Sequence, residues 1–322
     1  EHEHAGLLAP PAHANGRGMR EAGALPDAGP GWSDVSSDAT ASGRSASEIA
    51  RALAEGDLGA LYLLHSDPLR THPDRPVWQA ALAKASGVIA HASVLTEGIA
   101  EHADVVFPAE SYAEKEGTVT HPDGRLQRLR PAIGRPGAVR AEWSVIAELA
   151  ERLGAPPSPL TGPLVTARLA EAVPFYAGVT LDEIGGRGVR WQERDAASAF
   201  PAVGAGPFEL APPPPTPSAN GRLRLGTFRS LWAAPECESS PALKFLTAGG
   251  PRAELSPADA ERLGIADGDR VRIAHDGVAL EAEVVVRSGV PPGSVFVAEA
   301  IPGGGANLLT DGEPRLVEVR RG

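Results

Sequence analysis

Residues 61–107 alternate short apolar runs with segments of helical character, and this alternation limits the fold more than any other feature of the chain. The apolar runs predict three strands, at Leu61–Leu64, Gly87–His91 and Asp104–Phe107. A helix is predicted from Pro76 to about Ala85, and another begins at Thr96. Strands that alternate with helices are typical of a parallel sheet with right-handed crossovers. The predicted fold class is therefore α/β, a parallel sheet with flanking helices.

The third apolar run leads into a turn-rich segment. Pro108 ends the run, which suits a buried parallel strand whose carboxyl end opens a loop, and ligand crevices form at such ends. Gly117 permits a turn, Asp123-Gly124 is a strong turn dipeptide, and Arg125 follows on the returning strand. A guanidinium at this place can bind a phosphate or lie in solvent, and the spacing leaves both interpretations open.

Composition divides the chain into four parts. Residues 1–44 are rich in Gly, Ala, Ser and Pro and are interpreted as a truncated edge followed by a loop over Gly29–Gly43. Residues 45–155 form the α/β domain. Its clearest helix, Ala141–Leu153, is expected to pack on the sheet. The apolar face predicted for this helix consists of Trp143, Ile146, Ala147, Ala150 and Leu153.

The remaining two parts differ in character. Residues 156–242 are predicted to be a Pro- and Gly-rich connector, with short helices over 165–172 and 180–184 and a stiff spacer at Pro212–Pro215. Residues 243–322 are predicted to be β-rich and to fold independently. Their one predicted helix begins at Ser256-Pro257 and ends at Gly264.

Charge and cysteine content exclude several classes of function. A formal net charge of −11 argues against nucleic acid and anionic membrane surfaces as partners. No apolar run approaches the roughly 20 residues of a spanning helix, so direct membrane insertion is not expected. Cys237 is the single cysteine, so the chain cannot hold an iron–sulfur cluster or a disulfide by itself, and Cys237 is interpreted as a free thiol in a loop.

No catalytic residue and no metal site can be assigned from the residues alone. His65-Ser66-Asp67 contains the residue types of a nucleophilic triad, but adjacent positions point apart. Neither His65 with His72 nor His91 with His102 has the spacing of metal ligands on a helix. The run Gly303–Gly305 would let a ligand approach the backbone, yet it lacks the strand-to-helix context of a phosphate loop.

The segment from Ala103 to Arg128, ADVVFPAESYAEKEGTVTHPDGRLQR, resembles the molybdopterin oxidoreductase superfamily. The matching residues are Ala103–Pro108, Glu116–Thr118, Gly124, Arg125 and Gln127. At the carboxyl end, Leu255–Ile273 and Ala306–Thr310 are similar to the opening and closing segments of the superfamily's molydopterin dinucleotide-binding domain. The resemblance, and not the periodicity, implies that residues 243–322 close into a double-psi β-barrel. Ile184–Trp191 resembles the linker that precedes this barrel.

Near the amino end, Asn15–Gly18 and Glu21–Gly23 resemble one branch of the superfamily, the large iron–sulfur subunit of respiratory complex I, the NADH:quinone oxidoreductase. This resemblance begins part-way through the family pattern, which implies the carboxyl-terminal part of a larger protein. It further implies iron–sulfur clusters in an upstream part, peripheral-arm subunits of complex I as partners, and a peripheral position at the cytoplasmic face of the plasma membrane. In this interpretation the region is scaffold for electron transfer from NADH toward quinone, and the isolated chain is inactive.

Two alternatives stay open. One is a molybdopterin-dependent oxidoreductase of the formate dehydrogenase or nitrate reductase type, with molybdopterin guanine dinucleotide as cofactor. The residues that would line this cofactor are Ser66, Asp67, Thr96, Gly117, Thr118, Gly124, Arg125 and Asn307. The other is a non-redox assembly module. His121-Pro122-Asp123 departs from the Asn-x-Glu of the family's cofactor hairpin, and Pro122 has no N–H to donate, which favours the scaffold interpretation.

Overall fold

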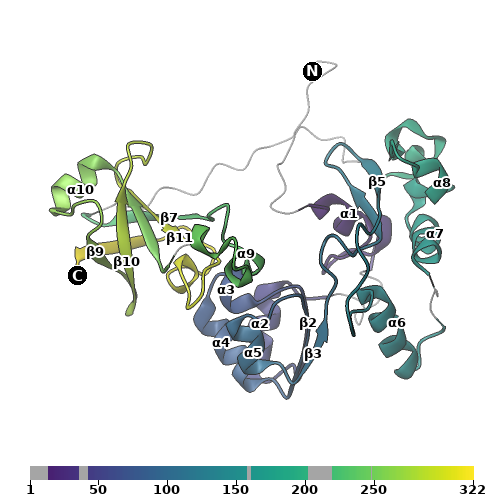
Figure 1. Ribbon diagram of the computed structural model, residues 1–322, viewed down its shortest axis with the longest axis horizontal. Coiled ribbons are helices and arrows are strands. Elements are labelled where there is room, and N and C mark those ends of the chain that lie inside the picture. Colours follow the sequence, from purple (N-terminus) through teal and green to yellow (C-terminus); the bar gives the residue numbers. More distant parts are fainter. Residues whose placement is uncertain (1–13, 36–42, 158–160, 202–219, 248) are drawn as a thin grey trace. The chain divides into compact units, whose positions relative to one another are not determined.

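The computed structural model describes residues 14–35, 43–157, 161–201, 220–247 and 249–322. The chain divides into two compact units, each formed from two stretches of sequence. Unit 1 comprises residues 1–47 and 108–209, and unit 2 comprises residues 48–107 and 210–322. Figure 1 labels elements of both units.

The first part of unit 2 is a three-stranded sheet in the order β1-β2-β3, with strands β1 (Ala60–Leu64), β2 (Gly87–Ala92) and β3 (Val105–Pro108). β1 and β2 pair in parallel, in a register that runs from Ala60 opposite Gly87 to Leu64 opposite His91. Four helices alternate with the strands: α2 (Ala46–Glu55), α3 (Pro68–Thr71), α4 (Arg75–Lys84) and α5 (Glu97–His102). The predicted parallel α/β arrangement is confirmed.

Apolar side chains of these helices and strands share one core. α2 contributes Leu53, α4 contributes Trp78 and Leu82, β2 contributes Val88, and α5 contributes Ile99. All five are at most 5% exposed. Burial of such side chains contributes roughly 1.5–3 kcal/mol each. The core therefore fixes the loops that follow β1 and β2.

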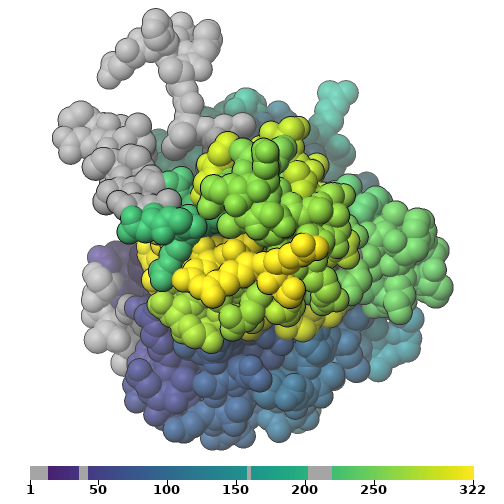
Figure 2. Space-filling model, turned by 90° about the vertical axis from the view of Figure 1, so that its left-hand side faces the viewer, coloured from purple at the N-terminus to yellow at the C-terminus, as the bar shows by residue number. Residues whose placement is uncertain are grey.

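The second part of unit 2 is a closed six-stranded barrel in the order β10-β8-β11-β7-β12-β9. Its strands are β7 (Leu223–Phe228), β8 (Arg252–Leu255), β9 (Arg270–His275), β10 (Val278–Val286), β11 (Ser294–Ala298) and β12 (Leu316–Arg321). β7 pairs in parallel with β11, and β8 pairs in parallel with β10. Figure 2 shows this barrel in green and yellow, with the end of β12 crossing its surface, above the blue helix and sheet part of the same unit.

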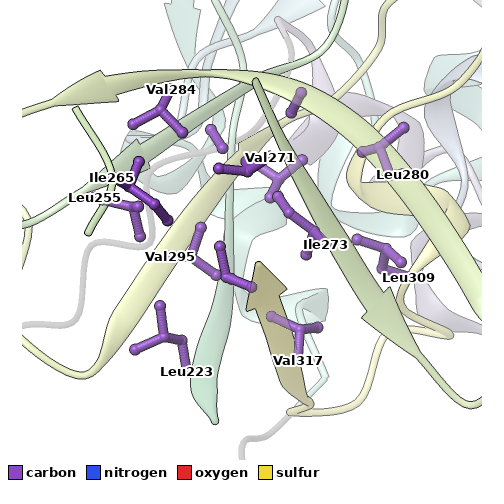
Figure 3. Close-up of a cluster of buried hydrophobic side chains, with 14 of the residues drawn as sticks. Leu223, Leu255, Ile265, Val271, Ile273, Leu280, Val284, Val295, Leu309 and Val317 are labelled. Atoms are coloured by element: carbon purple, nitrogen blue, oxygen red, sulfur yellow. The ribbon is translucent and has the colours of Figure 1, made fainter. Parts of the chain in front are cut away.

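The barrel is filled by side chains from every strand, as Figure 3 shows. Leu223 of β7 and Val317 of β12 lie in the same cluster as Leu255, Ile273 and Val295. The predicted domain began at residue 243, but β7 lies before that residue and pairs with both β11 and β12. The sequence could not reveal this strand as part of the barrel, because its partners are far away in the chain.

Helix α10 (Pro257–Leu263) begins and ends where the sequence predicted. The Ser256 hydroxyl accepts a hydrogen bond from the Asp259 N–H at 3.1 Å, and Pro257 occupies the first helical position. Gly264 ends the helix in the left-handed conformation, with φ 65°.

Unit 1 is built around a small sheet of β4 (Gly117–Thr120), β5 (Arg125–Leu129) and β6 (Val189–Arg190) in that order. Its helices are α1 (Gly16–Glu21), α6 (Glu142–Arg152), α7 (Gly162–Ala172) and α8 (Leu181–Ile184). Its core is aromatic: the Phe175 ring lies 4.6 Å from the Trp191 ring and 5.7 Å from the Trp32 ring, centroid to centroid.

Three expectations need correction. The strand at 104–107 was predicted to be buried, but Val105 is 45% and Val106 is 37% exposed, because β3 is the end strand of its sheet. The predicted apolar face of α6 does not form a packed stripe. Ile146 is 39% exposed and Leu153 is 88% exposed, whereas Val145, which was not predicted, is buried. α6 was also expected to pack on the parallel sheet, but α6 belongs to unit 1 and the sheet to unit 2.

The predicted connector contains ordered structure. Residues 161–200 include α7, α8 and β6, and Phe175, Tyr176 and Trp191 form part of a core. The two predicted short helices are confirmed, and the Thr180 hydroxyl caps α8 by accepting from the Glu183 N–H. Pro212–Pro215 lies outside the described residues, as does much of the predicted loop at Gly29–Gly43. Among the described helices, none has the length and apolar character to cross a bilayer.

Candidate functional site

Asp67 lies in the loop after β1 and caps α3. One carboxylate oxygen accepts from the Leu69 N–H at 3.0 Å. The other accepts from the Thr96 hydroxyl at 2.6 Å and from the Gly98 N–H at 3.0 Å. Asp67 is only 5% exposed, so these three donors replace the water that a carboxylate requires. The residue therefore ties the loop after β1 to the first turn of α5.

The first turn of α5 is shaped to receive this carboxylate. Thr96, the residue before the helix, is buried and turns its hydroxyl to Asp67. A Cβ atom at Gly98 would collide with the Asp67 carboxylate, so the position requires glycine. Two predicted site residues, Asp67 and Thr96, are thus in direct contact.

Asn307 reaches the same loop from the end of the barrel. Its side-chain amide donates to the Leu69 carbonyl at 2.9 Å, and its carbonyl accepts from the Gly305 N–H at 3.0 Å. Arg75 also donates to the Leu69 carbonyl. The run Gly303–Gly305 also makes a contact within the chain, because the Gly303 N–H donates to Glu97 at 3.1 Å.

A cavity of about 490 Å³ lies beside Asn307. Its charged and titratable lining residues are Arg70, His72, Arg224, Glu299 and Glu313. Arg70 is 3% exposed and pairs with Glu238 of α9 (Pro235–Ser239) at 2.5 Å. Burial lowers the pKa of His72. Ser66, the remaining candidate in unit 2, is half-buried and is not among the lining residues.

The other four candidates lie on the β4–β5 hairpin of unit 1. Gly117 and Thr118 belong to β4 and face Leu129 and Arg128 of β5. Gly124 forms the turn with φ 88° and donates to the His121 carbonyl at 2.8 Å. The structure therefore divides the candidates into two groups, one in each unit.

Arg125 begins the returning strand β5. Its backbone N–H donates to Asp123 at 3.0 Å, and its guanidinium lies 3.4 Å from the Arg187 carbonyl. The turn itself is held by Gln192, whose side-chain amide donates to the Asp123 carbonyl at 2.7 Å. Arg125 is thus engaged by its own hairpin and by the neighbouring linker.

A second polar network in unit 1 was missed by sequence reasoning. Glu21 is fully buried, forms an ion pair with Arg17 at 2.7 Å and accepts a hydrogen bond from the Tyr176 hydroxyl. Burial, together with this hydrogen bond to Glu21, raises the pKa of Tyr176 well above its usual range, so the phenol is a neutral donor. Arg17 also donates to the Pro122 carbonyl and lies 5.4 Å from the centre of the Trp191 ring.

This network joins three separate blocks of the sequence. Arg17 and Glu21 come from the amino-terminal block, Pro122 from the hairpin, and Trp191 from the linker. Asn15 completes the contact, since its side chain accepts from the Thr120 N–H at 2.8 Å. The available signal was the pair of charged residues at i and i+4 in the first block, which is typical of a helical ion pair.

Among the described residues, no cluster of three or more His, Cys, Asp or Glu side chains could hold a metal ion. Cys237 is a free, half-buried thiol on α9, and not a loop residue as predicted. Asp67, Thr96 and Asn307 direct their polar atoms to groups of their own chain. All three side chains therefore have hydrogen-bond partners within the chain.

Comparison with known protein families agrees with this fold. Residues 9–152 match the molybdopterin oxidoreductase family, and residues 223–318 match the molydopterin dinucleotide binding domain. The chain belongs to the molybdopterin oxidoreductase family. The second match includes β7, which agrees with the barrel described above.

Relatives of this family come from several kinds of oxidoreductase. The chain is 31% identical to the NADPH-Fe(3+) oxidoreductase subunit alpha of Geobacter sulfurreducens, over 95% of this chain and 36% of the relative. It is 31% identical to an NADH-quinone oxidoreductase subunit of Rhizobium meliloti, over 95% of this chain and 37% of the relative. It is 28% identical to a subunit alpha of F420-dependent formate dehydrogenase 1 from Methanococcus maripaludis, over 78% of this chain and 40% of the relative.

The chain thus spans 36–40% of the length of these relatives. Among solved structures, acetylene hydratase from Pelobacter acetylenicus superimposes with a TM-score of 0.58 at 16% identity. That superposition covers 85% of this chain and 46% of the other. It confirms the fold alone.

Proposed function

We propose that this chain is a scaffold region of the large iron–sulfur subunit of an NADH:quinone oxidoreductase of the complex I type. The observation that carries the proposal is the use of Asp67, Thr96 and Asn307 for bonds within the chain. Asn307 joins the barrel to the helix and sheet part of unit 2 through the Leu69 carbonyl, and Asp67 with Thr96 fixes the loop that carries Leu69. A cofactor would have to displace or share these contacts. The match to an NADH-quinone oxidoreductase subunit over 95% of this chain supports the same proposal.

The hairpin in unit 1 adds independent support. Pro122 has no N–H, and its carbonyl accepts a hydrogen bond from Arg17. Pro122 therefore offers no backbone donor to a ligand, and its carbonyl is already engaged by Arg17. Arg17 is itself held by the buried Glu21, so this side of the hairpin is fixed by the chain's own residues.

In this proposal, electrons pass through iron–sulfur clusters in another part of the full-length subunit, from the NADH side toward the quinone side. The subunit is held at the cytoplasmic face of the plasma membrane through other peripheral-arm subunits. This region contributes stability and contact surface. If the family's pterin dinucleotide were bound, it would supply electron-transfer chemistry; Ser66 and Asn307 would be candidates to hold it in unit 2, and Arg125 would be a separate candidate in unit 1.

The isolated chain is expected to oxidise neither NADH nor formate with artificial electron acceptors, because hydride and electron transfer require a cofactor. The sharper test uses the full-length subunit in its native complex with Asn307→Ala. If Asn307 has only a scaffold role, this substitution should lower the amount of assembled complex and leave turnover per assembled complex unchanged. An unchanged amount of complex with reduced turnover would contradict the proposal.

A further inference from the structure

Residues 229–247, called the strap here, connect β7 to the barrel strand β8 and include α9. None of these residues is buried, and none belongs to a buried apolar cluster. Leu231 is 85% exposed and Phe245 is 79% exposed. Since apolar burial is the main source of stability in a folded domain, the strap depends on polar contacts to stay in place.

Polar contacts join the strap to other described residues of unit 2. Glu238 pairs with Arg70 at 2.5 Å, and Arg229 lies 3.6 Å from Glu299. Glu236 accepts from the Ser93 hydroxyl at 3.1 Å. The first contact is the strongest, because Arg70 is 3% exposed and a charge at that depth requires a partner. The other two are more exposed and contribute less.

The two ion pairs have opposite polarity and converge on one cavity. Arg70 and Glu299 both line the cavity of about 490 Å³ beside Asn307. The strap supplies an anion, Glu238, to the first and a cation, Arg229, to the second. Closure of the strap therefore neutralises one positive and one negative group of the cavity wall at the same time.

We propose that the strap is a latch that opens as one piece, releases Glu299 from Arg229 and uncovers the buried guanidinium of Arg70. Glu238 is the residue that keeps it closed. Glu97 lies 3.9 Å from Arg70 and the Ala300 carbonyl lies 3.4 Å from it, so the guanidinium keeps partial compensation when Glu238 leaves. This residual compensation lets the open state form without unfolding of the barrel.

Two residues of the strap allow its opening to be measured. Lys244 is exposed within it, and Cys237 is the single cysteine of the chain. Tryptic cleavage after Lys244 requires local opening, and its rate follows the population of the open form. We therefore measure this rate by mass spectrometry, normalised to cleavage after Arg140, an exposed residue of unit 1. The rate at which a maleimide labels Cys237 provides a second measurement on the same samples.

Glu238→Gln should raise cleavage after Lys244 by about tenfold, because it removes a charge-assisted hydrogen bond to a buried guanidinium. Glu236→Gln is the matched control on the same helix. Glutamine can still accept from Ser93, so cleavage after Lys244 in this variant should be as fast as in the unchanged chain. Arg229→Gln, at an exposed position, should raise cleavage by about threefold.

Equal cleavage rates in the Glu238→Gln variant and the unchanged chain would overturn the latch. The same conclusion follows if Glu236→Gln accelerates cleavage as much as Glu238→Gln does. Faster labelling of Cys237 without faster cleavage after Lys244 would show a local change in α9 only, and would overturn the opening of the strap as one piece.

Discussion

Asp67 and Asn307 bind the two backbone groups of a single residue. The Asp67 carboxylate accepts from the Leu69 N–H at 3.0 Å, and the Asn307 amide donates to the Leu69 carbonyl at 2.9 Å. One belongs to the loop after β1 and the other to the end of the barrel. Because the two side chains are themselves buried, this clasp joins both parts of unit 2 through polar groups that are largely shielded from water.

Asn307→Ala should therefore destabilise the chain by about 1–3 kcal/mol, because it leaves the Gly305 N–H and part of the Leu69 carbonyl bonding unsatisfied. Chemical denaturation followed by circular dichroism measures the change. Ser288→Ala, at an exposed position on the barrel, is the control and should change the free energy of unfolding by less than about 0.5 kcal/mol. Equal effects for the two substitutions would argue against the clasp.

Substitution of two arginines of unit 1 should change the free energy of unfolding by very different amounts. Arg17→Ala leaves the fully buried Glu21 carboxylate without its cation and should cost about 3 kcal/mol or more. Arg125→Ala removes only a long contact to the Arg187 carbonyl and should cost under about 1 kcal/mol. Denaturation of both variants tests whether the buried network around Glu21 stabilises unit 1. A larger cost at Arg125 would show that the hairpin arginine has a role that its contacts do not reveal.

Several elements could be predicted from the sequence because their signals are local. α10 and α8 have capping residues within one turn, and β1 and β2 are short apolar runs next to helices. The missed features depend on distant partners. β7 completes the barrel by pairing with β11 and β12, and its Pro- and Gly-rich surroundings resemble a connector.

In the candidate site too, local signals and distant contacts differ in what the sequence reveals. The resemblance named Asp67, Thr96 and Asn307 among eight candidates to line the cofactor. In the structure Thr96 contacts Asp67, and Asp67 and Asn307 both contact Leu69. The resemblance could not reveal that their polar atoms serve the chain itself. Arg70 was not identified because nothing local distinguishes it from a surface arginine, and only the tertiary fold buries it.

The barrel should require β7 for independent folding. A fragment of residues 220–322 contains all six strands, whereas a fragment of residues 243–322 lacks the strand between β11 and β12. The longer fragment should unfold cooperatively on heating, and the shorter one should not, because it exposes two strand edges and the core around Leu223. Cooperative unfolding of the shorter fragment would contradict the role assigned to β7.

Acid stability should depend on Asp259. Burial alone would raise the pKa of this carboxyl, but hydrogen bonds from Ser256, Arg262 and the Gly293 N–H outweigh it and hold the pKa below its usual value. The folded state then binds the proton less tightly than the unfolded state does. The stabilisation is present above the unfolded pKa and is lost as pH falls through the folded pKa.

Asp259→Asn should consequently be less stable than the unchanged chain near neutral pH, and the difference should shrink as pH falls below about 4. Denaturation at a series of pH values measures this trend. Glu261→Gln, at an exposed position on the same helix, is the control. A difference that stays constant with pH would show that the ionised carboxylate is not the source of the stabilisation.

Metal and pterin analysis of the native full-length subunit tests most directly whether this region is scaffold. Elemental analysis for molybdenum and tungsten is combined with oxidative release of fluorescent pterin from the same preparation. The scaffold proposal predicts neither metal nor pterin above the background of a matched buffer. Near-stoichiometric metal and pterin would contradict it and would assign the subunit to the pterin-dependent enzymes of its family.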